Sequence, residues 1–99
     1  MINSRIRDLN KDEKPREKFL NNGAGALTDE ELIALLLRTG GVNFSAIDLA
    51  REILKSAGGL SNLHKYDIQK LLSHKYVNSA KAVAVKAAVE IAHRINYYS

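Results

Sequence analysis

The chain has 99 residues, of which 45% are hydrophobic, so it can build one small domain and not a second core. It contains no cysteine, which excludes a disulfide framework, a thiol nucleophile and a thiolate metal site. Because no run approaches the roughly 20 apolar residues of a membrane span and the charged N-terminus does not resemble a signal peptide, we expect a cytoplasmic protein with no membrane partner.

The net charge of +4 is placed unevenly along the chain. Residues 1–59 hold nine basic and nine acidic side chains, whereas residues 60–99 hold six basic and two acidic side chains. A basic face is typical of nucleic-acid binding. An excess this small also describes an ordinary solvated surface, and on charge alone we favour that interpretation.

Two helices are predicted within the first 40 residues. Proline is tolerated in a first helical turn, so Pro15 indicates a helix over residues 15–22. Glycines then break the chain. A capping box formed by Thr28 and Glu31 predicts the start of the second helix, whose leucine-rich run we expect to end at Gly40.

The same pattern of cap, apolar stripe and glycine stop recurs in the middle of the chain. Asn43 or Ser45 can cap this third helix, and Gly58 ends it. Its apolar residues are expected to face the core: Ile47, Leu49, Ala50, Ile53 and Leu54.

Two further helices are predicted in the last third of the chain. Asp67 can cap a brief helix over residues 68–72, and the longest helix runs from Ser79 to about Asn96. This last helix is apolar over most of its circumference, which predicts burial on several sides, either in the core of this domain or against a partner.

The helices predict an all-α fold, a compact small helical bundle, because no segment shows the alternation of a strand. The whole chain, residues 1–99, is expected to form a single domain, in which residues 1–13 are flexible. Residues 28–95 are expected to form one bundle without a strand. Seven side chains are predicted to be buried in it: Leu32, Leu36, Ile47, Ile53, Leu72, Val77 and Ile91.

The chemistry-bearing residues do not form a convincing catalytic constellation. The three histidines, His64, His74 and His93, match no helical pair spacing for a metal, and only His74 occupies an apolar-type position. The carboxylates at 29–31 are better explained as charges that complement a helix dipole. We therefore expect no metal site, no cofactor and no enzymatic activity in this chain.

The segment SHKYVNSAKA, residues 73–82, is predicted to be a tight turn between two helices. It makes residues 67–96 similar to a helix-hairpin-helix, in which a Gly-hydrophobic-Gly turn lets backbone N–H groups face a DNA phosphate. Val77 keeps the hydrophobic plug and Asn78 is a tolerable substitute for glycine. Tyr76 is the obstacle, because we expect its ring to lie across or beside the turn.

The run KPREKFLNNGAGALTDEELIALLLRTG, residues 14–40, closely resembles the N-terminal signature of the bacterial RadC family, in which P-R-E-K-L leads to a glycine, then A-L-[ST]-D-x-E-L and L-L-R-T-G. The register continues through LAREIL at 49–54 and AKA at 80–82, so the resemblance covers nearly all of the chain. It implies an N-terminal helical domain with a helix-hairpin-helix-like element, followed in the family by a metalloprotease-like domain of the JAB/MPN type with a zinc site. No zinc motif of that type occurs in these 99 residues, so the resemblance extends to the N-terminal domain alone.

Two functions remain open at this point. The first is a non-catalytic accessory domain, linked by the family label to DNA repair, that binds the backbone of duplex or structured DNA weakly and without sequence preference through a degenerate hairpin. Its candidate residues are Lys75, Tyr76, Val77, Asn78, Ser79, Ala80, Lys81 and Lys86. The second is an interaction or structural domain whose last helix packs on a JAB/MPN-like domain or on a second copy of the chain.

Overall fold

The computed structural model describes residues 14–99, so the expectation for residues 1–13 lies outside the described residues. Within residues 14–99 no strand forms, and the only pairing of the β type is an isolated bridge between Gly41 and Phe44. The all-α fold is therefore confirmed. In chain order the elements are α2 (Pro15–Asn22), η1 (Ala24–Ala26), α3 (Asp29–Leu37), α4 (Ala46–Ala57), η2 (Leu60–Lys65), α5 (Ile68–Leu72) and α6 (Ser79–Tyr98).

Local hydrogen bonds at the helix ends explain where the helices start and stop. Thr28 and Glu31 form the predicted capping box of α3, in which the N–H of Glu31 donates to Thr28 Oγ1 at 3.2 Å. Ser45, and not Asn43, caps α4 by accepting from the N–H of Asp48 at 3.0 Å. Gly58 adopts the left-handed conformation at φ 88° and ends α4, as predicted from the sequence.

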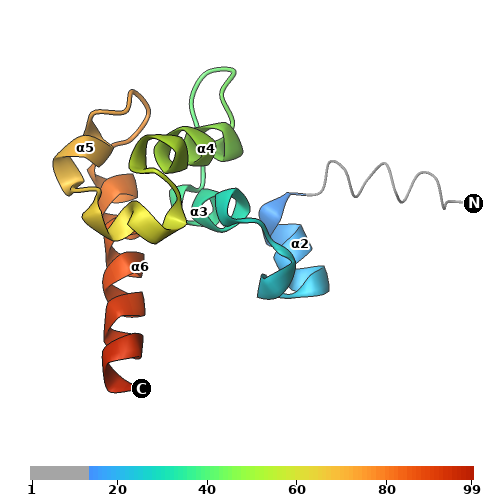
Figure 1. The fold of residues 1–99 in the computed structure, drawn as a ribbon. Coiled ribbons are helices and arrows are strands. Elements are labelled where there is room, and N and C mark those ends of the chain that lie inside the picture. Colours follow the sequence, from blue (N-terminus) through green and yellow to red (C-terminus); the bar gives the residue numbers. More distant parts are fainter. Residues whose placement is uncertain (1–13) are drawn as a thin grey trace, which may run out of the picture.

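The core lies where α3, α4, α5 and the first half of α6 meet (Figure 1). Its fully buried side chains come from four helices: Leu37, Leu49, Ile53, Leu71 and Val85. Helix α2 lies at the side of this group, tied to α3 by an ion pair of 3.0 Å between Lys18 and Glu31. The second half of α6 extends away from the other helices (Figure 1).

The structure confirms two of the seven predicted core residues and contradicts two. Ile53 and Val77 are buried, and Leu32, Leu36 and Ile47 are half-buried. Leu72 is 37% exposed because the five residues of α5 present only one face to the core, and the neighbouring Leu71 occupies it. Ile91 is 58% exposed because it lies on the side of α6 that faces away from the buried Ala82 and Val85.

The connection between α3 and α4, residues 38–45, departs from the expected helix end at Gly40. Helix α3 stops at Leu37 because Arg38 adopts φ 72° and ψ −45°. The N–H of Thr39 donates to the carbonyl of Leu37 at 2.8 Å, which makes this a γ-turn centred on Arg38. The 38–45 loop is therefore anchored directly at the end of α3.

Candidate functional site

The 73–78 turn joins α5 to α6 without any left-handed residue. Within residues 14–99, only Arg38 and Asn43 among the non-glycine residues have a positive φ. Asn78 is extended at φ −92°, and Val77 fills the turn from inside with 6% exposure. The 73–78 turn therefore needs no glycine at the positions where a helix-hairpin-helix has its two glycines. The assignment of residues 67–96 to a helix-hairpin-helix stays a prediction.

Tyr76 leaves the 73–78 turn and packs on the 38–45 loop. Its ring lies 5.6 Å from the ring of Phe44, centroid to centroid, and covers Gly41 so closely that a Cβ there would collide with it. The ring therefore lies beside the turn, where it holds two connections together.

The amides at the start of α6 are only partly available to a ligand. The N–H of Lys81 donates to Asn78 Oδ1 at 2.9 Å, so the cap already occupies this amide. Ser79 and Ala80 are exposed, and nothing within residues 14–99 accepts a hydrogen bond from their N–H groups. These two amides are the ones a phosphate could reach.

The three lysines assigned to this site by sequence take three different positions. Lys75 lies at the turn, with its Nζ 5.4 Å from the centroid of the Tyr76 ring. Lys81 Nζ donates to Thr39 Oγ1 at 2.6 Å and so links α6 to the 38–45 loop. Lys86 Nζ donates to the carbonyls of Tyr66, at 3.0 Å, and His64, at 3.4 Å. The structure therefore brings Lys75 and Lys81 to the turn, whereas Lys86 is bound to η2.

A second polar arrangement, which the sequence did not indicate, surrounds His74. Its side chain is 8% exposed, and its Nδ1 lies 2.6 Å from Glu52 Oε2 on α4. Since a carboxylate accepts, Nδ1 donates to Glu52, and Nε2 shares a hydrogen bond of 2.7 Å with the Tyr66 hydroxyl. These three side chains hydrogen-bond to one another, so we interpret the arrangement as a structural lock between α4, η2 and the 73–78 turn.

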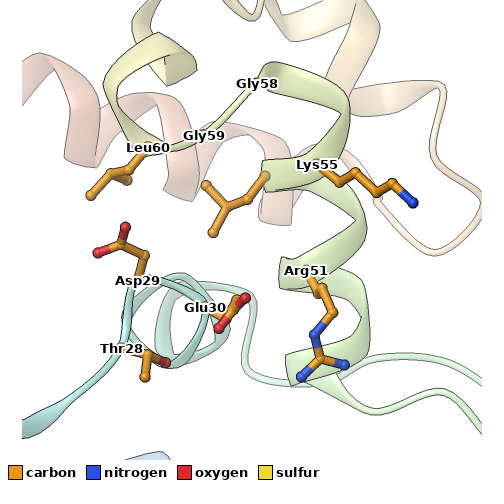
Figure 2. A pocket seen from close by; sticks show the side chains of 9 residues that line it. Thr28, Asp29, Glu30, Arg51, Lys55, Gly58, Gly59 and Leu60 are labelled. Atoms are coloured by element: carbon orange, nitrogen blue, oxygen red, sulfur yellow. The ribbon is translucent and has the colours of Figure 1, made fainter.

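A groove of about 510 Å³ lies between the start of α3 and the end of α4. Figure 2 shows Asp29 and Glu30 on one of its sides and Arg51 and Lys55 on the other. The two carboxylates stand in the first turn of α3, as expected for charges that complement the helix dipole. This groove carries opposite charges on facing sides and offers no preference for either sign of ligand.

Glu31 differs from its two acidic neighbours because it takes part in the structure. Its pKa is lowered mainly by the backbone N–H of Thr28 and further by Lys18. Among residues 14–99 there is no group of three or more side chains that could hold a metal ion. Nor does any helix in that part of the chain have both the length and the apolar character needed to cross a membrane.

The outer face of α6 is an apolar feature that residues 14–99 leave uncovered. Four side chains on one side of the helix are strongly exposed: Val83 at 58%, Ile91 at 58%, Ile95 at 62% and Tyr98 at 79%. The buried Ala82 and Val85 lie on the other side of the same helix. The sequence left two explanations for an apolar last helix, burial in this domain's core or against a partner. The core covers only one face of α6, so the other apolar face is left without a cover among residues 14–99.

Comparison with known proteins assigns the chain to a family. The family model described as UPF0758 N-terminal matches residues 6–83. UPF0758 proteins of Staphylococcus epidermidis and Flavobacterium johnsoniae are 44% identical over 92 residues and 43% identical over 89 residues, covering 93% and 90% of this chain. A UPF0758 protein of Staphylococcus aureus is 41% identical over 91 residues, or 92% of the chain.

The matched segments make up 41%, 39% and 40% of those three relatives, so this chain spans about two fifths of their length. No solved structure matches the chain. The signature in residues 14–40, the helical fold and these matches agree, and the chain belongs to the UPF0758 N-terminal family, which is the RadC-like family that its sequence resembles.

Proposed function

We propose that this chain is a non-catalytic accessory domain of a RadC-like protein that works by docking the outer face of α6 on a partner domain. The observation that carries this proposal is the exposed stripe of Val83, Ile91, Ile95 and Tyr98. Full burial of one such side chain is worth roughly 1.5–3 kcal/mol, so covering even part of the stripe favours association.

The position of the stripe supports docking over an ordinary solvated surface. Every residue from Glu90 onward is exposed, and this half of α6 extends away from the body (Figure 1). A helix that projects while carrying isoleucines at i and i+4 presents an anchor pattern typical of helix recognition. The ion pair of 2.9 Å between Glu90 and Arg94 lies next to the stripe and provides a polar edge.

The partner we propose is the JAB/MPN-like domain that the family resemblance implies. The relatives are more than twice as long as the segment that matches this chain, and the matching family model is an N-terminal one. The part of those proteins that this chain does not cover is long enough to hold such a domain. The proposal holds whether that domain is on the same chain or on another.

The test uses the remainder of the Staphylococcus epidermidis relative, prepared separately and titrated into this chain by calorimetry. We expect Ile91→Glu with Ile95→Glu to weaken binding by at least about tenfold, or about 1.4 kcal/mol, because two charges then enter the apolar contact. The control Lys75→Glu changes charge on another face and leaves binding unaltered.

Equal binding by the parent and the double variant would contradict the proposal. Light scattering that shows a dimer of the parent, lost in the double variant, would instead assign the stripe to a second copy of the chain.

Weak DNA binding at the 73–78 turn is the second candidate, favoured by the free amides of Ser79 and Ala80 next to Lys75. Contacts of this kind give dissociation constants of roughly 10⁻⁴–10⁻⁶ M, with affinity that falls as salt rises. The test is fluorescence anisotropy of a labelled duplex over a salt series.

Ser79→Pro is the sharpest variant for this test, because proline is tolerated at the first helical position yet removes the N–H. We expect it and Lys75→Ala to weaken binding, and we expect a smaller effect from Lys86→Ala, whose ammonium binds η2 carbonyls. A parent protein without salt-dependent binding, or a Ser79→Pro variant that binds as well as the parent, would make the turn a structural corner.

A further inference from the structure

A groove of about 880 Å³ opens on the side of the domain where the start of α2, the end of α3 and the start of α4 come together. Two half-buried apolar side chains, Leu35 and Ile47, line it, and we call them its floor. Three cations also line it, Lys14, Arg16 and Arg38, and we call them its rim. The groove thus combines an apolar surface with three cations drawn from two separate helix ends.

The three rim cations have no counter-ion among residues 14–99, where no hydrogen bond or ion pair to any of their side-chain nitrogens forms. Elsewhere in the same part of the chain, Lys18, Arg51 and Arg94 each lie within 3.4 Å of a carboxylate oxygen. The one carboxylate that lines the groove, Glu17, accepts from the backbone N–H of Lys14 at 3.3 Å. Among residues 14–99 the lining therefore carries three cations against one carboxylate, a net positive charge.

Arg38 is held at this rim by the backbone rather than by its side chain. Its γ-turn follows directly on the buried Leu37 and precedes Thr39, which receives the ammonium of Lys81. The guanidinium itself stays exposed and available for a bidentate contact with a carboxylate.

We infer that this groove binds a short acidic peptide segment of a partner protein, with aspartate or glutamate side chains on the basic rim and an apolar side chain on the floor. Charge complementarity selects the carboxylates. The floor selects against a nucleic-acid backbone, which has no apolar side chain to cover Leu35 and Ile47. A small inorganic anion would leave that floor open to water. This site is separate from the α6 stripe, so either proposal can fail alone.

The test is fluorescence anisotropy with the full chain and a fluorescein-labelled peptide of sequence Asp-Asp-Leu-Asp-Asp-Phe. We expect Arg38→Gln to weaken its binding about fivefold, and Arg16→Gln combined with Arg38→Gln at least about tenfold. Arg51→Gln is the matched control, because it removes the same charge from a residue of α4 that does not line the groove, and it should change affinity by less than about twofold. A peptide with asparagine at every aspartate position should bind at least about tenfold more weakly.

Three results would overturn the inference. The first is equal binding of the asparagine peptide, and the second is a loss with Arg51→Gln as large as the loss with Arg38→Gln. The third is displacement of the peptide by a duplex oligonucleotide whose own binding depends on Arg38, which would assign the groove to nucleic acid. If Arg38→Gln disturbs the 38–45 loop, Arg16→Gln alone still tests the inference, because Arg16 lies on α2 and not in that loop. Ile91→Glu leaves peptide binding unaltered if the two sites are independent.

Discussion

Arg38 adopts a conformation that is costly for any residue with a side chain. At φ 72° its Cβ crowds the backbone, and strain of this kind is worth about 1–3 kcal/mol. It persists because the residues on both sides are fixed, Leu37 by the core and Thr39 by Lys81. The strained residue is also a rim cation of the 880 Å³ groove, so stability and binding are opposed at this one position.

The first prediction is that Arg38→Gly raises the free energy of unfolding by about 1 kcal/mol, since glycine relieves the strain at a smaller entropic cost. For a domain of this size that corresponds to a rise of about 4–8 °C in the melting temperature. The control Arg51→Gly, in the interior of α4, should instead lower the free energy by about 1 kcal/mol. Both are measured by urea denaturation, and similar losses from the two variants would show that Arg38 is not strained.

Glu31 makes stability depend on pH at the level of a single residue. Folding lowers its pKa, chiefly through the N–H of Thr28, so the unfolded chain binds the proton more readily. The stabilisation is therefore complete above the ordinary glutamate pKa of about 4.3 and is lost as the pH falls through the lower, folded pKa.

The second prediction is that Glu31→Gln flattens the acid side of the stability profile measured by urea denaturation between pH 6 and pH 3. Glutamine can still reach the Thr28 N–H but gains nothing from ionisation. Glu30→Gln is the control, because the Glu30 carboxylate makes no hydrogen bond among residues 14–99, and this variant should keep the parent's dependence. A profile unchanged by Glu31→Gln would mean that other carboxylates cause the acid loss.

At the scale of elements, the short helix α5 is held in place by few contacts. Helix α5 has five residues and contributes a single fully buried side chain, Leu71, while its neighbour Leu72 is 37% exposed. The adjacent lock of Glu52, His74 and Tyr66 keeps α5 in place against α4 and η2. The position of α5 therefore depends mainly on Leu71, with Ile68 also packed against the core, and on the adjacent polar lock.

The third prediction compares the two adjacent leucines. Leu71→Ala should cost about 2–5 kcal/mol of unfolding free energy, the usual range for a fully buried leucine. Leu72→Ala should cost less than about 1 kcal/mol, because it removes surface that is already partly hydrated. Chemical denaturation of both variants decides this, and equal costs would mean that α5 is rotated relative to the described structure.

At the scale of the whole molecule, the domain divides into a packed body and a projecting helix end. The last α6 residue that packs against the core is the half-buried Val89, and residues 90–99 are all exposed. The buried side chains of α6 therefore lie in its first half, whereas three of the four side chains of the proposed docking stripe, Ile91, Ile95 and Tyr98, lie in its second half.

The fourth prediction is that deletion of residues 91–99 changes the free energy of unfolding by less than about 1 kcal/mol, because it removes no buried side chain. The same deletion should abolish docking of the partner domain. Deletion of residues 83–99, which also removes the fully buried Val85, should unfold the domain. Thermal unfolding followed by circular dichroism measures both, and a large loss from the shorter deletion would place the end of α6 in the stable body.

The amino-acid sequence by itself determined the helical class, the family and most helix boundaries. Thr28 with Glu31, Asp67 with Lys70, and Gly58 act through hydrogen bonds spanning three or four residues, so their effect is readable along the chain. The same local rules predicted α2 and the start of α6.

Only the tertiary structure decided which faces are covered and which charges remain unpaired. Glu52 reaches His74 across 22 positions, Lys86 reaches His64 across 22, and Lys81 reaches Thr39 across 42. Helical periodicity shows that α6 has two apolar faces but not which one meets the core, because that depends on where the other helices pack. For the same reason the basic groove of Lys14, Arg16 and Arg38 had no signal in the sequence, since it forms only when the ends of α2 and α3 are brought together.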